Sequence, residues 1–241
     1  MKTGFLYGDA RTPKFVYYYY HGKIMQCRKE PRIPPYIYYD THPAEYPPNF
    51  YYECDTMPNG ATPPMTFHSS RGTTVTIAGG LFEAHTCNCP GYGQSYVRYY
   101  WPIHPTYKLE ITALFPTLQI DDPNPGYTDA AVQTSTANGP GVKSRRIYRT
   151  SGGHNYIYDE YTQIQTSEWV FYRRPFTNYM HIIIEKILGT NKWNFYFNDE
   201  LISYITNPYL WRINFTLAGL PAPGGLETMD YIRAWVDKER T

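Results

Sequence analysis

The chain has 241 residues, a formal net charge of +1 and 18% charged residues. This balance gives no reason to expect a partner that is a nucleic acid or an anionic membrane. No apolar run approaches about 18 residues, which excludes a membrane-spanning helix. A chain of this length suits one large all-β domain and can bury a core without disulfides.

The first 60 residues are unusually rich in tyrosine and proline, in a chain with 27 tyrosines and 21 prolines. Residues 16–20 and 36–39 are predicted strands with one solvated side, and proline clusters interrupt them. We expect residues 1–60 to pack onto a domain formed by residues 61–241, as edge strands or a strap, or onto a neighbouring subunit. The segment carries too many aromatic rings to stay solvated.

The first six residues contain no apolar segment typical of a signal peptide. The sequence leaves the compartment open, and we expect an extracellular or virion-associated protein rather than a cytoplasmic one.

From residue 65 onward, short strand candidates alternate with turns rich in Gly, Pro, Asn and Asp. Such spacing with few helix signals predicts a sandwich or jelly roll. Residues 226–240 fit either a helical face or a strand. The strand candidates are residues 65–68, 73–77, 80–86, 95–103, 109–118, 130–136, 144–149, 156–161, 168–173, 179–188, 193–197 and 210–217.

The four cysteines are Cys27, Cys54, Cys87 and Cys89. His85, Cys87 and Cys89 would share one face of a strand, which is a weak zinc pattern because structural zinc sites usually use two separated ligand pairs. Buried free thiols are the favoured interpretation. Asp121 and Asp122 lie in a proline-rich stretch, where we expect them to shape a turn.

Seven further segments carry, in chain order, motifs of one family of carbohydrate-active enzymes. Residues 80–85 resemble G-Y-F-E-A-R, 99–102 the A-F-W segment, 108–114 the catalytic strand G-E-I-D-I-x-E, 176–179 F-H-x-Y, 193–198 I-x-F-Y-V-D, 214–219 N-L-A-V-G-G and 229–235 V-D-Y-V-R-V-Y. Together they resemble glycoside hydrolase family 16, the laminarinase and lichenase group. The resemblance covers roughly residues 70–237.

The resemblance implies an all-β fold, a concanavalin A-like β-sandwich or jelly roll of two antiparallel sheets. It implies a central strand at residues 108–118, and it favours a strand over a helix at 229–236. It also makes Glu110 a relic of the family's nucleophile. Thr112 stands where the family has the orienting aspartate, and Leu114 where it has the acid/base (Phe115 if the strand is bulged). Because hydrolysis normally needs two carboxyl groups flanking the scissile bond, we expect no turnover by the ordinary mechanism.

Four residues are the predicted ligand-binding set, namely Trp101, Glu110, Thr112 and Asn214. Trp101 would stack on a sugar, although a tryptophan in a sandwich is often part of the core. Asn214 would present its amide to the same groove, and it also begins an Asn-Phe-Thr glycosylation acceptor pattern. Asp230 matches the family's calcium-binding aspartate, so calcium is the single cofactor to consider, and otherwise none is expected.

Three functions remain open at this point. The leading hypothesis is a glycan-binding, catalytically degenerate jelly roll with an oligo- or polysaccharide partner. The second is a structural or assembly protein, such as a coat or virion component, that associates with itself or with virion partners through residues 1–60. The third is an active endo-β-glucanase that uses Glu110 with a displaced acid. Whether Glu110, Trp101 and Asn214 share one open groove helps to discriminate among them.

Overall fold

The computed structural model describes residues 6–7, 15–20, 23–28, 48–69, 72–86, 94–134, 139–167, 170–206, 208, 211–218 and 224–237. The chain divides into two compact units, residues 1–41 and 42–241. The first unit contains a three-stranded antiparallel sheet of β1 (Leu6–Tyr7), β2 (Phe15–Tyr20) and β3 (Lys23–Arg28). The strand predicted at residues 16–20 is therefore confirmed, whereas the one at 36–39 lies outside the described residues.

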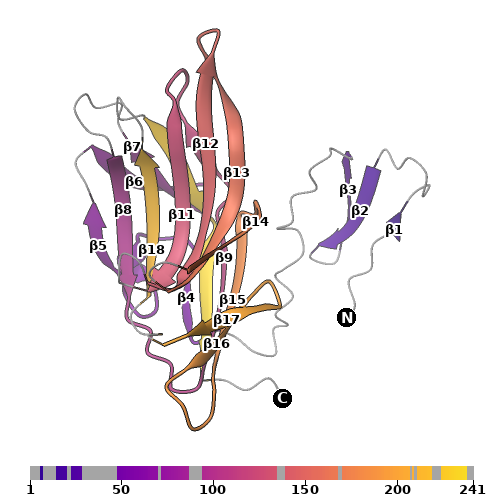
Figure 1. Cartoon of the computed structure of the whole chain (residues 1–241). Helices are drawn as coiled ribbons and strands as arrows, with labels where there is room; N and C mark the ends of the chain where they lie inside the picture. The colour runs from indigo at the N-terminus through magenta and orange to yellow at the C-terminus, as the bar shows by residue number, and fades with distance from the viewer. Residues whose placement is uncertain are drawn as a thin grey trace. The chain divides into compact units, whose positions relative to one another are not determined.

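The second unit has a seven-stranded antiparallel sheet as one layer (Figure 1). Its order is β14-β13-β12-β11-β18-β8-β5. The strands are β5 (Thr66–Ser69), β8 (Gln94–Trp101), β11 (Gly126–Thr134), β12 (Gly141–Ser151), β13 (His154–Ser167), β14 (Val170–Pro175) and β18 (Trp211–Ala218).

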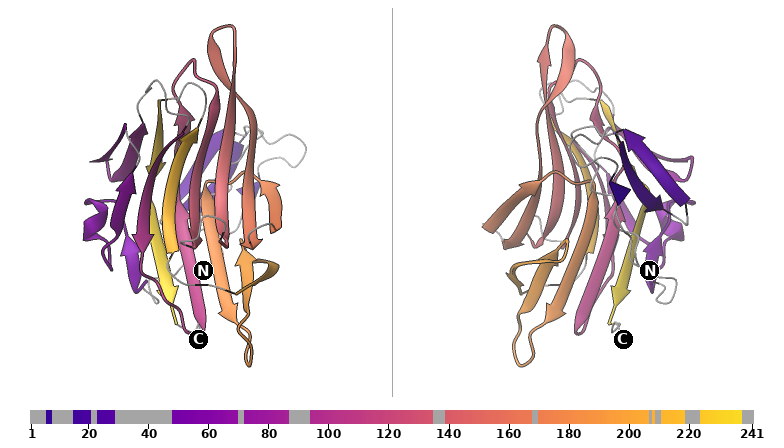
Figure 2. Two further views of the ribbon diagram at one scale, coloured as in Figure 1. Left: turned by 60° about the vertical axis from the view of Figure 1, so that its left-hand side comes forward. Right: turned by 90° about the vertical axis from the view of Figure 1, so that its right-hand side faces the viewer.

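A six-stranded sheet and a four-stranded sheet pack against the seven-stranded one (Figure 2). The six-stranded order is β17 (Glu200–Ile205), β16 (Trp193–Phe197), β15 (Tyr179–Lys186), β9 (Lys108–Leu114), β20 (Tyr231–Val236) and β4 (Phe50–Tyr52). The four-stranded order is β10 (Leu118–Ile120), β19 (Gly225–Met229), β7 (Leu81–Thr86) and β6 (Thr73–Ala78). A single turn of 3-10 helix, η2 (Pro58–Gly60), precedes β5.

Alternating apolar residues from the two layers form one core. On β9, Leu109, Ile111 and Ala113 are fully buried. On the seven-stranded sheet the same is true of Val97 and Trp101 on β8, Ala130 and Val132 on β11, and Ile213 and Phe215 on β18. Phe82 and Phe215 stack across the layers with ring centroids 5.3 Å apart. The predicted all-β jelly roll of packed antiparallel sheets is confirmed by this pairing and packing.

Two strand predictions need correction at their ends. The central strand predicted at residues 108–118 stops at Leu114, because Phe115 N–H donates to Asn178 O and Pro116 has no N–H to donate. The C-terminal segment is extended, as predicted, but it divides at Asp230 into β19 and β20. β9 does lie in the middle of its sheet, between β15 and β20.

Residues 48–60 of the predicted N-terminal segment lie within the second unit. β4 pairs with β20, and the side chains of Tyr52 and Cys54 are 1% and 0% exposed within the core. Asn49 adds two hydrogen bonds to the backbone of Val236. How residues 1–41 pack stays a prediction.

No helix in the described part of the chain is long and apolar enough to cross a membrane. Within the same residues, no group of three or more His, Cys, Asp or Glu side chains is arranged to hold a metal ion. Cys87 and Cys89 of the weak zinc pattern lie outside the described residues, and His85 Nε2 lies 3.0 Å from Glu83 Oε2. Cys54 is a buried free thiol, and burial raises its pKa to about 12.

Candidate ligand-binding face

The predicted ligand-binding residues lie in three separate environments. Trp101 is 1% exposed in the core, and its indole N–H donates to Pro63 O at 3.2 Å. Glu110 and Thr112 are 3% and 1% exposed on the six-stranded sheet. Asn214 is 7% exposed on β18 of the seven-stranded sheet.

The structure therefore does not bring these residues into one groove. Ile111 on β9 faces the core, so its neighbours Glu110 and Thr112 face away from the core. Ile213 and Phe215 on β18 also face the core, so Asn214 faces away from it on the other layer. Glu110 and Asn214 thus lie on opposite outer sides of the sandwich.

Glu110 lies beside a histidine of the neighbouring strand β15. Glu110 Oε1 lies 2.8 Å from His181 Nε2, and both side chains are buried. The residue opposite Glu110 on β20 is Trp235, which is 5% exposed. Glu110 is therefore enclosed by neighbouring side chains of its own sheet.

Asp230 lies between β19 and β20, where its backbone N–H donates to Leu114 O. Calcium at this residue stays a prediction. Asp121 and Asp122 do shape a turn: Asp121 O accepts from Asn124 N, and the Asp122 carboxylate accepts from Asn155 N. Hydrogen bonding to His154, 2.7 Å away, lowers the pKa of Asp122.

The outer side of the seven-stranded sheet is lined by polar and aromatic side chains, and we call it the polar face. Its residues alternate with core residues and stand opposite one another across neighbouring strands. They are His68 on β5; Tyr96, Arg98 and Tyr100 on β8; Arg212, Asn214 and Thr216 on β18; Tyr127, Asp129, Ala131 and Gln133 on β11; Lys143, Arg145, Ile147 and Arg149 on β12; Asp159, Tyr161, Gln163 and Gln165 on β13; and Arg173 on β14.

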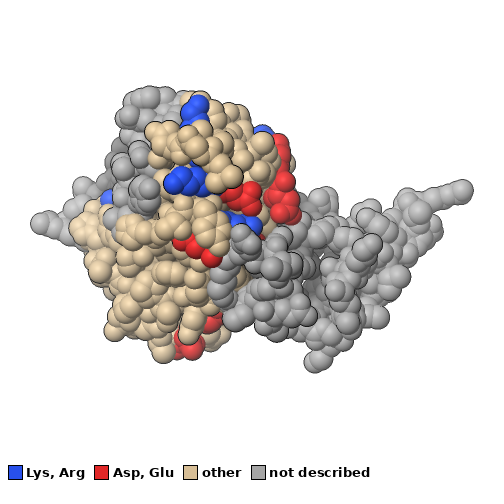
Figure 3. All heavy atoms as spheres, turned by 90° about the horizontal axis from the view of Figure 1, so that it is seen from below, with Lys and Arg blue, Asp and Glu red and all other residues tan. Residues whose placement is uncertain are grey.

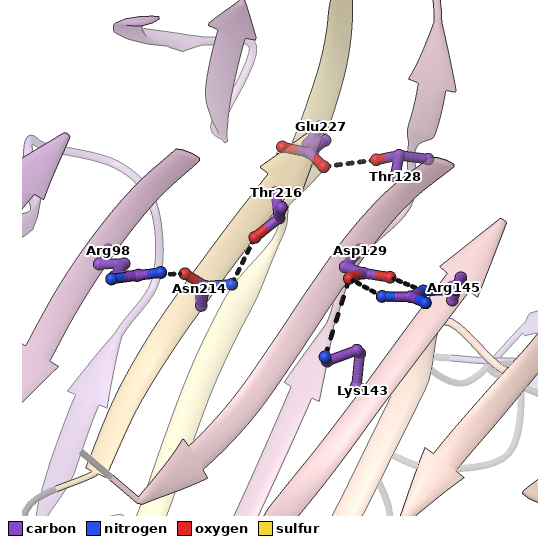
Figure 4. Close-up of polar contacts among 8 residues, drawn as sticks. All are labelled: Arg98, Thr128, Asp129, Lys143, Arg145, Asn214, Thr216 and Glu227. Atoms are coloured by element: carbon purple, nitrogen blue, oxygen red, sulfur yellow. Dashed lines mark hydrogen bonds and ion pairs between the residues drawn. The ribbon is translucent and has the colours of Figure 1, made fainter. Parts of the chain in front are cut away.

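Asp129 anchors the first cluster on the polar face (Figure 4). Arg145 on β12 donates two hydrogen bonds to the Asp129 carboxylate, at 2.6 and 2.7 Å. Lys143 Nζ lies 3.9 Å from the same carboxylate. Burial disfavours the charge on Arg145, but hydrogen bonding and attraction to Asp129 outweigh burial and raise its pKa. Burial lowers the pKa of Lys143, since Asp129 only partly offsets it.

Asn214 anchors the second cluster, which connects β8 and β18 (Figure 4). Arg98 Nε donates to Asn214 Oδ1 at 2.8 Å, and Asn214 Nδ2 donates to Thr216 Oγ1 at 2.6 Å. Arg212, in the same cluster, is 5% exposed. Its guanidinium donates to the side-chain amide oxygen of Gln133. Burial, and then repulsion by Arg98, lower the pKa of Arg212.

Arginine–tyrosine stacking recurs along the polar face. Each of four guanidinium carbons lies within the range of a cation–π contact. The pairs and their distances to the ring centroid are Arg98 over Tyr96 (4.0 Å), Arg145 over Tyr127 (4.1 Å), Arg149 over Tyr158 (3.3 Å) and Arg173 over Tyr161 (3.7 Å). These pairs involve five of the seven strands, so aromatic rings and cations are interleaved across the sheet.

A carboxyl group also lies beneath this sheet, between the two layers. Glu227 on β19 is 1% exposed and accepts a hydrogen bond from Thr128 Oγ1 on β11 (Figure 4). Burial raises the pKa of Glu227 well above its usual value, which favours the neutral form of the group.

The end of the molecule seen in Figure 3 differs from the polar face in its charge pattern. Most of the described surface in this view is uncharged, and basic and acidic side chains lie among one another.

Comparisons with known proteins can now be set beside this geometry. No protein-family model and no curated protein matches the sequence. Among solved structures, the chain is similar to endo-acting O-glycanases of human gut microbiota (TM-score 0.46, 12% identity), covering 78% of this chain and 99% of that one. It is also similar to a Flavobacterium laminarinase (0.43, 11%; 77% and 98%) and to Bacillus licheniformis β-glucanase (0.41, 12%; 79% and 98%). The strand pairing of the chain itself shows a jelly roll of packed antiparallel sheets.

Most residues of the polar face were not singled out from the sequence. Asp129 and Arg212 are isolated charged residues, whereas Arg145 lies in a basic stretch, and only strand register brings the three together. One usable signal was the alternation of Tyr127, Asp129 and Gln133 with the small or apolar residues between them, which is typical of a strand with one polar side.

Proposed function

We propose that the protein binds a glycan on the polar face and does not hydrolyse it by a two-carboxylate mechanism. The interleaving of arginine–tyrosine pairs with amide side chains supports this most directly. Aromatic rings can stack on the apolar faces of sugars, and a few fixed amides and guanidinium groups can bond to hydroxyl groups. Asn214 and Gln133 are such amides on neighbouring strands, and their orientations are fixed by Arg98 and Arg212.

The carboxyl groups of the polar face argue against glycoside hydrolysis. Asp129 is committed to two hydrogen bonds with Arg145, and Asp159 is paired with Arg173. β12 separates the two aspartates, which also differ by two positions in register. Strand spacing then puts their Cα atoms roughly 12 Å apart. Both carboxyl groups are engaged by arginines, and among the described residues neither stands directly opposite another carboxyl group, as the close pair of a retaining mechanism would.

The family's catalytic-strand motif also argues against hydrolysis when it is aligned with the strand that pairs with Asn214. That strand is β11, since Asn214 pairs with Ala131. At the spacing of the unbulged form of the motif, β11 has Asp129, Ala131 and Gln133 on the polar face. The acid/base position would hold an amide, which cannot protonate a leaving group and so removes a contribution of about 10²–10⁴ in rate.

The test combines a binding assay with a turnover assay. Purified protein is run through native gels containing laminarin, lichenan, agarose or carrageenan, and reducing ends are measured in parallel. We expect retardation by at least one polysaccharide and no release of reducing ends above that of an Asp129→Asn variant. Asn214→Ala should weaken binding about tenfold, while Thr112→Ala on the opposite layer should leave it unchanged.

Two results would contradict the proposal. Turnover that disappears in Asp129→Asn or in Glu110→Gln would establish an enzyme. Equal weakening by Asn214→Ala and Thr112→Ala would remove the polar face from consideration, because the two side chains lie on opposite sides of the sandwich.

A further inference from the structure

We infer that the glycan bound by the polar face is anionic, and that Arg98 and Arg212 bind its sulfate or carboxylate groups. This inference rests on the proposed function and specifies the chemical class of its ligand. It depends on charge balance, on the burial of Arg212 and on the position of the two arginines in neighbouring strands.

Charge on the polar face is strongly unbalanced compared with the chain as a whole. The chain has 22 Lys and Arg against 21 Asp and Glu. Among the described residues, the polar face carries two carboxylates, Asp129 and Asp159, and each is already paired with an arginine. Its basic residues are six: Arg98, Lys143, Arg145, Arg149, Arg173 and Arg212.

Arg212 is the most informative of these cations because its charge is buried without a carboxylate. Arg212 is 5% exposed, and its hydrogen-bonding partners are neutral groups, the amide of Gln133 and the hydroxyl of Tyr100. Within the described residues, no Asp or Glu lies within ion-pair distance of Arg212 or Arg98. A buried charge that lacks a counter-charge is costly and is rare unless a partner supplies one.

Arg98 increases the cost of burying the charge of Arg212. Arg98 stands opposite Asn214, and Arg212 stands opposite Tyr100, so the two arginines are diagonal neighbours on β8 and β18. Diagonal positions in an antiparallel pair are roughly 7–8 Å apart, within reach of long side chains. Two guanidinium groups with fixed forks at this spacing can bond several oxygens of one sulfate or carboxylate.

The neutral partners of both arginines leave donors for a ligand. Arg98 uses its Nε to bond Asn214, and its guanidinium also lies over the Tyr96 ring. A sugar ring stacked near Tyr96 or Tyr100 would bring a substituent toward this pair. An anion bound there would supply the counter-charge that the described residues do not.

The experiment compares matched polysaccharides that differ in charge. Affinity is measured for polygalacturonate and its methyl ester, and for a sulfated galactan and its desulfated form. We expect binding at least tenfold tighter for the charged member of one or both pairs, and this difference should shrink between 50 and 500 mM NaCl. The two pairs separate carboxylate recognition from sulfate recognition.

Variants then assign the effect to the two arginines. Arg98→Gln should lower affinity for the charged polysaccharide at least tenfold, and Arg212→Gln should do the same if it folds. Arg174→Gln is the matched control, since Arg174 lies on the other side of β14 and pairs with Glu200. Circular dichroism and thermal melting verify folding, and Arg98→Gln alone is sufficient for the test.

The outcomes distinguish this inference from the function on which it rests. Equal affinity for charged and neutral members, with no loss in Arg98→Gln, would overturn the inference and leave glycan binding intact. Equal losses in Arg98→Gln and Arg174→Gln would also overturn it, because they would reflect net charge alone. Failure to bind all four of these polysaccharides and all of those in the panel above would contradict both the inference and the proposed function.

Discussion

The two outer sides of the sandwich each carry a buried carboxyl group near the middle of a sheet. Glu110 on the six-stranded sheet and Asp129 on the seven-stranded sheet are 3% and 2% exposed. Their surroundings differ: Glu110 lies beside His181 and Trp235, both nearly fully buried, whereas Asp129 lies beside Arg145 and Lys143, whose side chains are 20% and 27% exposed. A motif resemblance can identify a strand, but side chains on the neighbouring strands determine whether a ligand can reach its residues.

The largest expected effect on stability concerns β4, at the edge of the six-stranded sheet. Deleting residues 1–60 should lower the free energy of unfolding by about 5 kcal/mol more than deleting residues 1–41. The longer deletion removes β4 and the buried side chains of Tyr52 and Cys54, along with the Asn49 hydrogen bonds to Val236. Urea unfolding of both truncated proteins measures the difference, and equal stabilities would show that β4 contributes little.

Removing the carboxylate of the seven-stranded sheet should have the next largest effect. Asp129→Ala leaves the half-buried Arg145 and Lys143 without a counter-charge, and we expect a loss of about 3 kcal/mol in unfolding free energy. Asp159→Ala breaks an exposed pair with Arg173 and should cost under about 1 kcal/mol. Similar losses in the two variants would mean that the Asp129 cluster is no stronger than a surface ion pair.

Glu227 extends the comparison to a carboxyl group between the layers. Its folded-state pKa is raised by burial, so the folded protein keeps a proton that the unfolded chain releases. The contribution of this carboxyl group to the free energy of unfolding is complete below the unfolded-state pKa of about 4.3. As pH rises above that value, the contribution falls by about 1.4 kcal/mol per pH unit until the folded-state pKa is passed. Melting of wild type and Glu227→Gln from pH 5 to 9 should show the variant gaining relative stability as pH rises. Parallel pH profiles would contradict a raised pKa of Glu227.

The aromatic rings provide the smallest expected effect. Tyr161→Ala should weaken glycan binding about fivefold, or about 1 kcal/mol, because it removes a ring stacked with Arg173 on the polar face. Tyr204→Ala is the control, since Tyr204 is exposed on β17 of the six-stranded sheet with Lys192 4.2 Å from its ring centroid. Equal effects on affinity would show that exposed tyrosines bind glycans without regard to the sheet they lie on.

Much of the fold could be predicted from the sequence because strand alternation and turn residues are local signals. Residues 193–197 were predicted with the observed bounds, and their burial alternates at every position. β17 was missed although Asn198 and Asp199, both with positive φ, form a two-residue connection typical of a hairpin. β19 was missed because five residues containing a buried glutamate carry little strand signal.

The candidate site could not be predicted in the same way, because it depends on register between distant strands. Asp129 and Arg145 are 16 positions apart, and Arg98 and Asn214 are 116 positions apart. Glu110 attracted attention since its local sequence resembles a catalytic strand, but local sequence does not tell which of two layers a strand joins. Trp101 illustrates the same point, because its ring lies on the core side of a strand whose polar side carries Arg98 and Tyr100.

The hairpin of β12 and β13 has a consequence for the order of folding. Gly152 and Gly153 connect Ser151 to His154, and both have positive φ, as a type I′ turn requires. Such a turn closes a hairpin within microseconds, without waiting for distant parts of the chain. By contrast, β18 must find β8 and β11 across long stretches of chain. We therefore expect β11–β13 to assemble first and to serve as the template on which β18 later docks, so that Asp129 meets Arg145 before Arg98 meets Asn214.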